Sequence, residues 1–442
     1  MSETPPSITI GLLGCGTVGT GILELIRRRQ WHEYWVRVNR AFVRDPARPR
    51  LLPVPVECTD RVEQIVTDPD IDVVIDVLPD PGTAYGPVRQ ALENRKHVIS
   101  ANWQLLATHG DELEQFAREQ GVAFLYEAAM TGSVPFAHIA QRWTRVSPIR
   151  AFLGIPHGVE RLWGLPESRS DDGASESEQM MRFGIAPSAR TEHEWERSVA
   201  WVILIGRWAA GTWISREHIR IRKNTPKDHR VIELARAHGY ALCPAFLWED
   251  HTTWQRALVE WMAVPDRCPL AHLSPYEAGL LVWYEDIGPQ LYTGLGGGAL
   301  PAAAAVLADL LRIVQRDWSF TRALSWHPHR DDQAQDAYFL VLHVAHQSDN
   351  IHACVTHLQD HAISVQHVHV NTHPASPGFE IVIVTERVPD ATMRTVVHSL
   401  EKHPGVHTVD AFRIPDILTW SPERVYHKQW TPAEIAHAVS SG

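Results

Sequence analysis

The stretch SITIGLLGCGTVG, residues 7–19, decides the fold of this chain. Its first half is a short apolar run rich in β-branched residues, and its second half is a G-x-G-x-x-G turn at Gly14, Gly16 and Gly19. Beyond the turn, apolar residues recur at helical spacing as far as Ile26. A strand, a glycine turn and a helix that open a βαβ unit are the sequence signature of a dinucleotide site.

Each glycine of this turn has its own task. Gly14 allows the tight turn, Gly16 lets the backbone approach a pyrophosphate, and Gly19 lets the helix pack closely on the strand. The helix start, at Thr17 and Val18, offers free N–H groups and a positive dipole end to phosphates. The alternative is a structural glycine turn without a ligand.

The end of the second expected strand bears on the choice of cofactor. NAD-specific sites commonly place an acidic residue there, where it meets the ribose hydroxyls. In this chain Arg44 precedes Asp45, and Arg48 and Arg50 follow closely. Because arginine binds a phosphate through two hydrogen bonds, the pattern favours NADP over NAD. The alternative is that these arginines form a solvated surface loop.

Strands and helices alternate through the first third of the chain, which predicts a doubly wound, Rossmann-type parallel sheet. The expected strands are 7–13, 35–43, 72–78, 97–101 and 122–126, and the expected helices after the first are 82–94 and 111–120.

The middle of the chain is mixed, and the last part has a pattern of its own. We expect helices at 195–210, 226–238 and 301–314, strands at 252–264 and 276–284, an exposed acidic loop at 166–179 and a polar linker at 316–335. Residues 337–344, 351–362, 364–371, 379–385, 390–402 and 406–412 then read as strand, helix, strand, strand, helix and strand. That βαββαβ order predicts a small ferredoxin-like module.

Composition limits the classes of protein and partner. The chain has 442 residues, too many for one core, and a formal net charge of -11, so two or three domains are expected and nucleic acid is not an expected partner. The five cysteines are scattered, which supports neither a disulfide framework nor a zinc site. No signal peptide and no apolar run of membrane-spanning length is recognisable, so we expect a cytoplasmic protein.

Several motifs together resemble the ACT-domain type of homoserine dehydrogenase. The glycine turn is followed in the family's order by four further segments, and the last module resembles an ACT domain. The four segments are ALENRKHVISAN (91–102), YEAAMTGSVP (126–135), PLA (269–271) and GLGGGALPAAA (294–304). The resemblance extends from residue 8 to about residue 416.

The resemblance implies an architecture and a reaction. It implies an NAD(P)-binding domain at 1–150 completed by a helix at 301–315, a central α/β catalytic and dimerisation domain at 151–300, an ACT domain at 336–416 and a tail at 417–442. The reaction would be hydride transfer between NADP and homoserine or aspartate semialdehyde, with the protein moving the hydroxyl proton. A homodimer or higher homo-oligomer is also implied.

The resemblance also implies site residues. The family's cofactor contacts correspond to the turn from Gly14 to Gly19 and to Leu78, Pro79, Ser100, Ala101, Asn102, Gly298 and Ala299. A monovalent cation held by backbone carbonyls belongs to the family as well. Its positions correspond to Glu127, Met130, Gly132 and Val134.

The sequence departs from the family where the family has its catalytic lysines. Those positions carry Trp103 and Trp201, and no lysine occurs between Lys96 and Lys223. Tryptophan cannot accept the proton of an alcohol, and its flat face favours an aromatic or cationic ligand. The catalytic residues are therefore unknown. His157, Glu160 and His193 are the local substitutes, and each could instead be an ordinary polar residue. The alternative function is an inactive or repurposed cofactor-binding regulatory homologue.

The expected ACT domain has two features of interest. Its first loop reads Gln347-Ser348-Asp349-Asn350, where Asn350 could take a left-handed backbone in place of glycine. An effector could bind at this loop, or the module could serve assembly alone. His367 and His369 share one strand face, which indicates either a metal site or a polar outer face.

Overall fold

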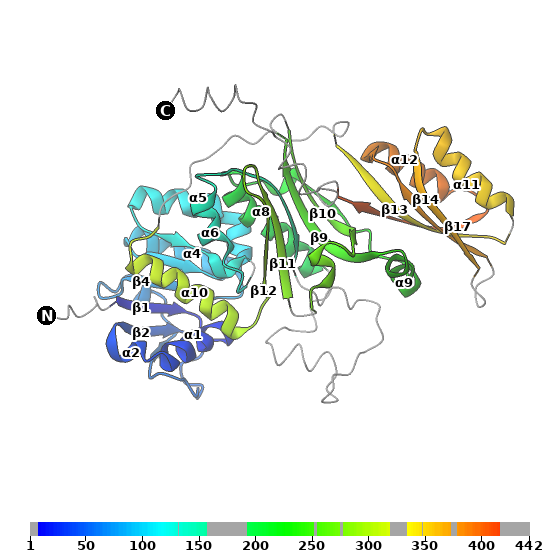
Figure 1. Ribbon diagram of the computed structural model, residues 1–442. Helices are drawn as coiled ribbons and strands as arrows, with labels where there is room; N and C mark the ends of the chain where they lie inside the picture. Colours follow the sequence, from blue (N-terminus) through cyan, green and yellow to red (C-terminus); the bar gives the residue numbers. More distant parts are fainter. Residues whose placement is uncertain are drawn as a thin grey trace, which may run out of the picture.

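The computed structural model describes residues 8–130, 132–156, 192–251, 254–274, 277–318, 334–346, 348–372 and 378–415. Figure 1 shows an elongated molecule in which an N-terminal domain, a central sheet and a C-terminal module follow one another. Among the described helices, none combines the length and apolar character needed to span a bilayer.

The predicted parallel sheet is confirmed. Its strand order is that of a Rossmann sheet, and β4 is buried along its whole length, as expected of a strand covered on both faces. The strands in spatial order are β3 (Glu57–Thr59), β2 (Val36–Phe42), β1 (Ile8–Leu13), β4 (Val73–Asp76), β5 (His97–Ser100) and β6 (Phe124–Leu125). The short edge strand β3 was not anticipated.

Helices cover both faces of this sheet, and the most distant in sequence is α10. A Cβ on Gly21 would lie 2.7 Å from the carbonyl oxygen of Ala299, so only glycine lets α10 approach α1 this closely. The helix predicted at 111–120 is the second half of α5, which begins at residue 103 behind the Asn102 cap. The helices are α1 (Thr17–Arg28), α2 (Trp31–Tyr34), α3 (Glu63–Val66), α4 (Pro81–Glu93), α5 (Trp103–Gln120), α6 (Phe136–Trp143) and α10 (Ala299–Val314).

The central sheet is mostly antiparallel and carries α8 and α9. It consists of β12 (Gly288–Leu295), β11 (Glu277–Tyr284), β7 (Ile149–Ile155), β9 (Tyr240–Asp250) and β10 (Gln255–Pro265) in this spatial order, with β8 (Ile219–Arg222) beside β10; α8 spans Glu192–Ala209 and α9 spans His229–Ala237. The sequence did not reveal β7, β8, β9 or β12. β9 is buried on both faces, so it lacks alternation, and Pro244 argues against a strand.

The C-terminal module has the predicted βαββαβ order. It contains β13 (Gln335–Val344), α11 (Ser348–Asp360), β14 (Val365–Thr372), β15 (Phe379–Thr385), the short β16 (Val388–Pro389), α12 (Asp390–Leu400) and β17 (Val406–Ile414). The module's strands are not a separate sheet. β17 pairs with β10 at Met262 and Arg413, so one continuous sheet runs from β12 to β14.

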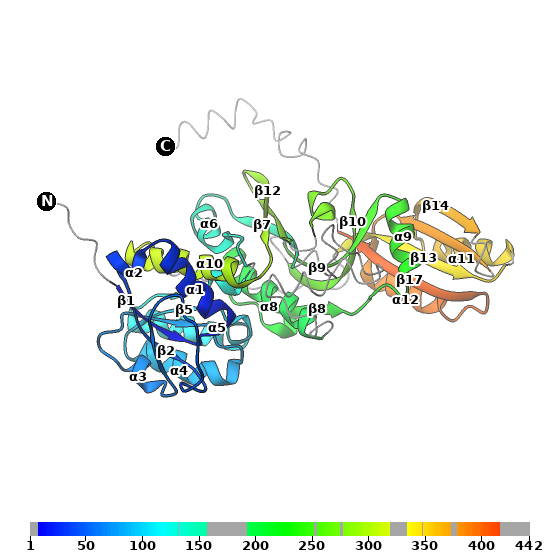
Figure 2. The same ribbon diagram turned by 90° about the horizontal axis from the view of Figure 1, so that it is seen from below.

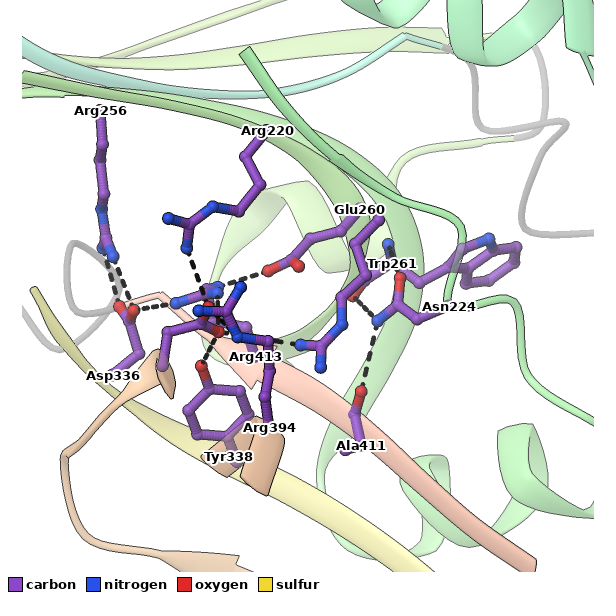
Figure 3. Close-up of polar contacts among 12 residues, drawn as sticks. Arg220, Asn224, Arg256, Glu260, Trp261, Asp336, Tyr338, Arg394, Ala411 and Arg413 are labelled. Carbon is purple, nitrogen blue, oxygen red and sulfur yellow. Dashed lines mark hydrogen bonds and ion pairs between the residues drawn. The ribbon is translucent and has the colours of Figure 1, made fainter. Parts of the chain in front are cut away.

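Charged side chains are buried where β17 meets β10 (Figure 3). Arg413 lies at the centre and pairs with Glu260, Asp336 and Asp390. Arg256 donates two hydrogen bonds of 2.7 and 2.8 Å to Asp336. We call these five residues the interdomain ion cluster. Because a buried charge without a partner is costly, the cluster makes docking of the module a condition for a stable central sheet.

Candidate cofactor and substrate sites

The glycine turn is shaped by the backbone behind it. Gly14 has φ +110°, and a Cβ there would lie 3.0 Å from the carbonyl oxygen of Val77. A Cβ on Gly19 would lie 2.5 Å from the carbonyl oxygen of Gly14. A Cβ on Gly16, in contrast, would meet nothing within 4 Å. Two of the glycines are thus required by the fold, and the third faces open space.

That open space is a cleft of about 970 Å³ at the carboxyl edge of the parallel sheet. α1 begins beside it without a side-chain cap and without an acidic residue in its first turn, so its N–H groups are free to bind phosphate. The arrangement fits a dinucleotide. The predicted contacts that line the cleft are Gly14, Gly16, Arg44, Leu78 and Pro79; Thr17, Val18, Gly19, Ser100, Ala101, Asn102, Gly298 and Ala299 are not among its lining residues.

The three arginines that follow β2 differ in their surroundings. All three line the cleft. Arg50 donates to the carbonyl oxygens of Asp45 and Arg48, at 2.7 and 2.9 Å, and thereby holds its own loop. Arg44 and Arg48 have exposed side chains at the rim. They are the two that can reach a phosphate at the end of β2.

A buried carboxylate that the sequence reading missed organises the carboxyl edge of the sheet. Asp76 accepts hydrogen bonds from the Leu78 backbone at 3.0 Å and from the Ser100 hydroxyl at 2.8 Å. Burial raises the pKa of Asp76 to about 6. Ser100 in turn accepts from the backbone N–H of Asn102. The signal was an aspartate inside the apolar run 72–78.

Asn102 and Trp103 mark the start of α5. The Asn102 side chain accepts from the Leu105 backbone at 3.0 Å and caps the helix, while its buried Nδ2 has no partner among the described residues. The guanidinium of Arg197, on α8, lies 5.9 Å from the centre of the Trp103 ring. A side chain of the protein itself, rather than a bound ligand, therefore supplies a cation beside this tryptophan.

The second tryptophan that the resemblance places at a lysine position is enclosed. Trp201 is 2 % exposed and packs edge-to-face on Phe246 at 5.9 Å. It belongs to the core between α8 and the central sheet. Neither position therefore presents a group that could take up a proton.

A buried network holds α5 and α8 together. Arg207 donates two hydrogen bonds of 2.7 Å to Glu114, and the Trp213 indole donates a third, also of 2.7 Å. Because α5 carries Trp103 and α8 carries Arg197, this network sets the geometry between them.

Trp213→Phe is expected to lower the free energy of unfolding by about 2 kcal/mol. The change removes a hydrogen bond to a buried charge and part of the ring that packs on Gly110. Urea unfolding of this variant tests the prediction. Trp143→Phe is the control, because the Trp143 ring is 43 % exposed. Equal stability of the two variants would contradict the role of Trp213.

The other predicted site residues lie as follows. His157, Glu160 and the loop 166–179 are outside the described residues, and His193 lies in α8 with a side chain outside them. The expectation that Asn350 takes a left-handed backbone is wrong. It lies in α11, donates to the Ala345 carbonyl at 3.2 Å and packs on Gly405. Within the helix its side chain, rather than its backbone, closes the loop.

The loop proposed for a monovalent cation lies between α6 and the end of β12. The Glu127 carboxylate accepts from the Ala137 and His138 N–H groups at the start of α6, at 2.8 and 2.9 Å. The Val134 carbonyl accepts from Phe136. Gly132 has φ +65°, and a Cβ there would lie 2.7 Å from the Leu295 carbonyl. These contacts fix the loop.

Two family models match this chain. The model described as the homoserine dehydrogenase NAD-binding domain matches residues 14–127, and the model described as homoserine dehydrogenase matches residues 198–311.

Relatives and solved structures agree with these matches. A homoserine dehydrogenase of Bacillus subtilis is 25% identical over 70% of this chain and 73% of its own length. A homoserine dehydrogenase of Pseudomonas aeruginosa is 25% identical over 90% of this chain and 96% of its own length. The crystal structure of a homoserine dehydrogenase from Thiobacillus denitrificans has a TM-score of 0.82 at 23% identity, covering 93% of this chain and 99% of that one, and shares its fold.

Proposed function

The chain belongs to the homoserine dehydrogenase family and carries its NAD-binding and catalytic domains, and we propose that it is an NADP-dependent oxidoreductase. The proposed substrates are homoserine and aspartate semialdehyde, or a related pair of an amino-acid-derived alcohol and aldehyde. The observation that carries the proposal is the cleft at the glycine turn, where Gly16 faces open space beside the uncapped start of α1.

Bound NADP would supply the hydride acceptor, and the protein would position both molecules and move one proton. Gly14, Gly16 and the start of α1 would hold the pyrophosphate, with Leu78 and Pro79 against the dinucleotide. Proton transfer by a positioned side chain contributes about a hundredfold to ten-thousandfold. With Trp103 and Trp201 at the family's lysine positions, His157, Glu160 and His193 are the proposed acceptors.

Consumption of NADPH with aspartate semialdehyde tests the activity, with NADPH binding followed by fluorescence in the same samples. Turnover supports the proposal and directs mutagenesis to His157 and Glu160. Binding without turnover would favour a repurposed cofactor-binding homologue, in line with the enclosed Trp201 and the Arg197 guanidinium over Trp103. Failure to bind either NADPH or NADH would overturn the cofactor assignment.

Arg44→Ala is expected to weaken NADPH binding about tenfold and to leave NADH binding unchanged. Arg44 lies at the rim of the cleft at the end of β2, and a hydrogen bond between charged groups contributes about 1.5–3 kcal/mol. Fluorescence titration with both cofactors measures the difference. Equal losses for NADH and NADPH would contradict a contact with the 2′-phosphate.

Two finer proposals follow from family membership. The protein would assemble as a homodimer or higher homo-oligomer, and the C-terminal module would act as an ACT domain that binds a small effector. The edge strand β12 carries exposed Leu291 and Leu295, which offers an apolar surface for assembly. Light scattering after gel filtration tests the first proposal, and calorimetric titration with amino acids tests the second.

A further inference from the structure

We propose that the protein has a transition-metal site made of His238, His367 and His369, at the contact between α9 and the C-terminal module. Each of these side chains offers a ring nitrogen within 4.8 Å of those of the other two. His238 follows directly after α9, and the other two lie on β14 (Figure 2). The site is separate from the proposed cofactor cleft and goes beyond the proposed activity.

The spacing of the three rings suits one small metal ion. The His238 ring centre lies 5.1 Å from that of His369 and 5.9 Å from that of His367. His367 and His369 stand nearly parallel, 8° apart, because they are two positions apart on one strand. A tetrahedral ion with bonds of about 2.0–2.1 Å would bring ligand nitrogens to roughly 3.4 Å from one another. In the proposed site, rotations of the exposed His367 and His369 side chains would close that difference.

The hydrogen bonds of two rings leave one nitrogen of each ring available as a ligand. Nδ1 of His238 lies 2.8 Å from the Leu234 carbonyl oxygen, which can only accept, so Nδ1 carries the proton and Nε2 has the free lone pair. Nε2 of His369 lies 2.8 Å from Oδ1 of Asn371. In that amide orientation Nε2 donates, and Nδ1 of His369 is left as the ligand atom. Such partners on the non-ligating nitrogen are usual for metal-binding histidines.

The two elements that carry the histidines are held in fixed relation. Arg230, in α9, donates hydrogen bonds of 3.0 and 2.9 Å to the two oxygens of Glu380, a buried residue of β15. β15 pairs with β14, in register at His367 and His369. The interdomain ion cluster fixes the same module to β10 from the other side. The third histidine is therefore positioned by the fold.

The ligand set selects the class of metal. Imidazole nitrogens suit Zn²⁺, Cu²⁺, Ni²⁺ and Co²⁺, whereas Mg²⁺ and Ca²⁺ require oxygen ligands. His367 and His369 are exposed, so water can take the fourth position of a tetrahedral ion. A bound ion would connect the central sheet to the C-terminal module and would stabilise their contact by mass action.

Zinc binding by the full-length, chelator-treated protein tests the site. Competition with a chromophoric chelator is expected to give one Zn²⁺ per chain. His238→Ala and His369→Ala should each weaken binding by at least about tenfold. His407→Ala is the matched control because His407 is an exposed histidine on β17, outside the site. Circular dichroism and thermal melting check that each variant folds.

The position of His238 makes the test decisive. His367 and His369 lie on one strand, so a surface pair could bind zinc without α9. The site does not exist as proposed if His238→Ala binds Zn²⁺ as tightly as the unchanged protein. The same conclusion follows if a variant lacking all three histidines still binds one Zn²⁺ per chain. Added Co²⁺ gives a second readout, because visible absorption typical of four-coordinate cobalt should appear in the His407→Ala protein and be absent in His238→Ala.

Discussion

Gly16→Val is expected to reduce NADPH affinity by at least about a hundredfold while the protein keeps its stability. A Cβ at this position meets nothing within 4 Å, so the folded protein has room for the new side chain. The room it takes is the cleft beside the start of α1, where the proposed pyrophosphate would contact the backbone. Loss of two charge-assisted hydrogen bonds at about 1.5 kcal/mol each corresponds to roughly a hundredfold.

Two comparisons make this experiment specific. Gly86→Ala places a side chain at an exposed glycine of α4 that also has nothing within 4 Å, and it should leave NADPH binding unchanged. Gly19→Ala forces a Cβ to within 2.5 Å of the Gly14 carbonyl, and it should lower both the melting temperature and the affinity. NADPH titration measures the affinity of the three variants, and thermal melting measures their stability. Unchanged binding by Gly16→Val would place the dinucleotide elsewhere.

Arg413→Met is expected to lower the free energy of unfolding by about 3–5 kcal/mol, which is the cost of removing one partner from a buried ion pair. Arg413 is 1 % exposed and pairs with Glu260, Asp336 and Asp390, so the change leaves three carboxylates facing one another in the interior. Methionine keeps much of the volume, which separates the electrostatic effect from a cavity.

Urea unfolding measures this loss, and Arg394→Met is the control. Arg394 pairs with Asp390 at 3.4 Å from the rim of the same cluster, but its side chain is 42 % exposed, so a loss of about 1 kcal/mol or less is expected. Equal losses in the two variants would show that the burial of an arginine does not decide how much it contributes to the stability of this cluster.

The interdomain ion cluster also predicts an acid dependence. The arginine neighbours, with Arg413 foremost, and the Tyr338 hydroxyl lower the pKa of Asp390 from 3.8 to about 2. A depressed acid stabilises the folded state above its unfolded pKa, so this contribution is present above about pH 4 and is lost between about pH 4 and pH 2. The loss of stability between about pH 4 and pH 2 should be smaller in Arg413→Met, because Arg413 contributes most to the lowered pKa of Asp390.

The parts of the fold with a regular local pattern were predictable. The glycine turn, the alternation of strands and helices, and the βαββαβ order of residues 335–414 all appear in the structure. β9 was missed because it is covered on both faces and contains Pro244, so neither its periodicity nor its composition indicates a strand. The continuity of β10 with β17 was also missed, since pairing between distant strands leaves no local signal.

Side chains that meet across the fold were the least predictable. His367 and His369 indicated a shared face, but His238 comes from another domain and is brought to them only by the docking of α9. The positions of Arg256 and Glu260 in the sequence did indicate buried ion pairs. The two residues are four positions apart on one face of a strand whose other residues, apart from Gln255 at its start, are apolar, and charges in such a strand require buried partners.

The path of the chain through its sheets sets the order in which the protein can be completed during synthesis. α10 packs on α1 and the nucleotide-binding sheet, yet it is made only after the central sheet. β17, whose Arg413 neutralises Glu260, is the last described strand. A ribosome that stalls between these elements therefore holds a chain with an uncovered apolar face and uncompensated charges, which is a substrate for chaperones rather than a folded half of the protein.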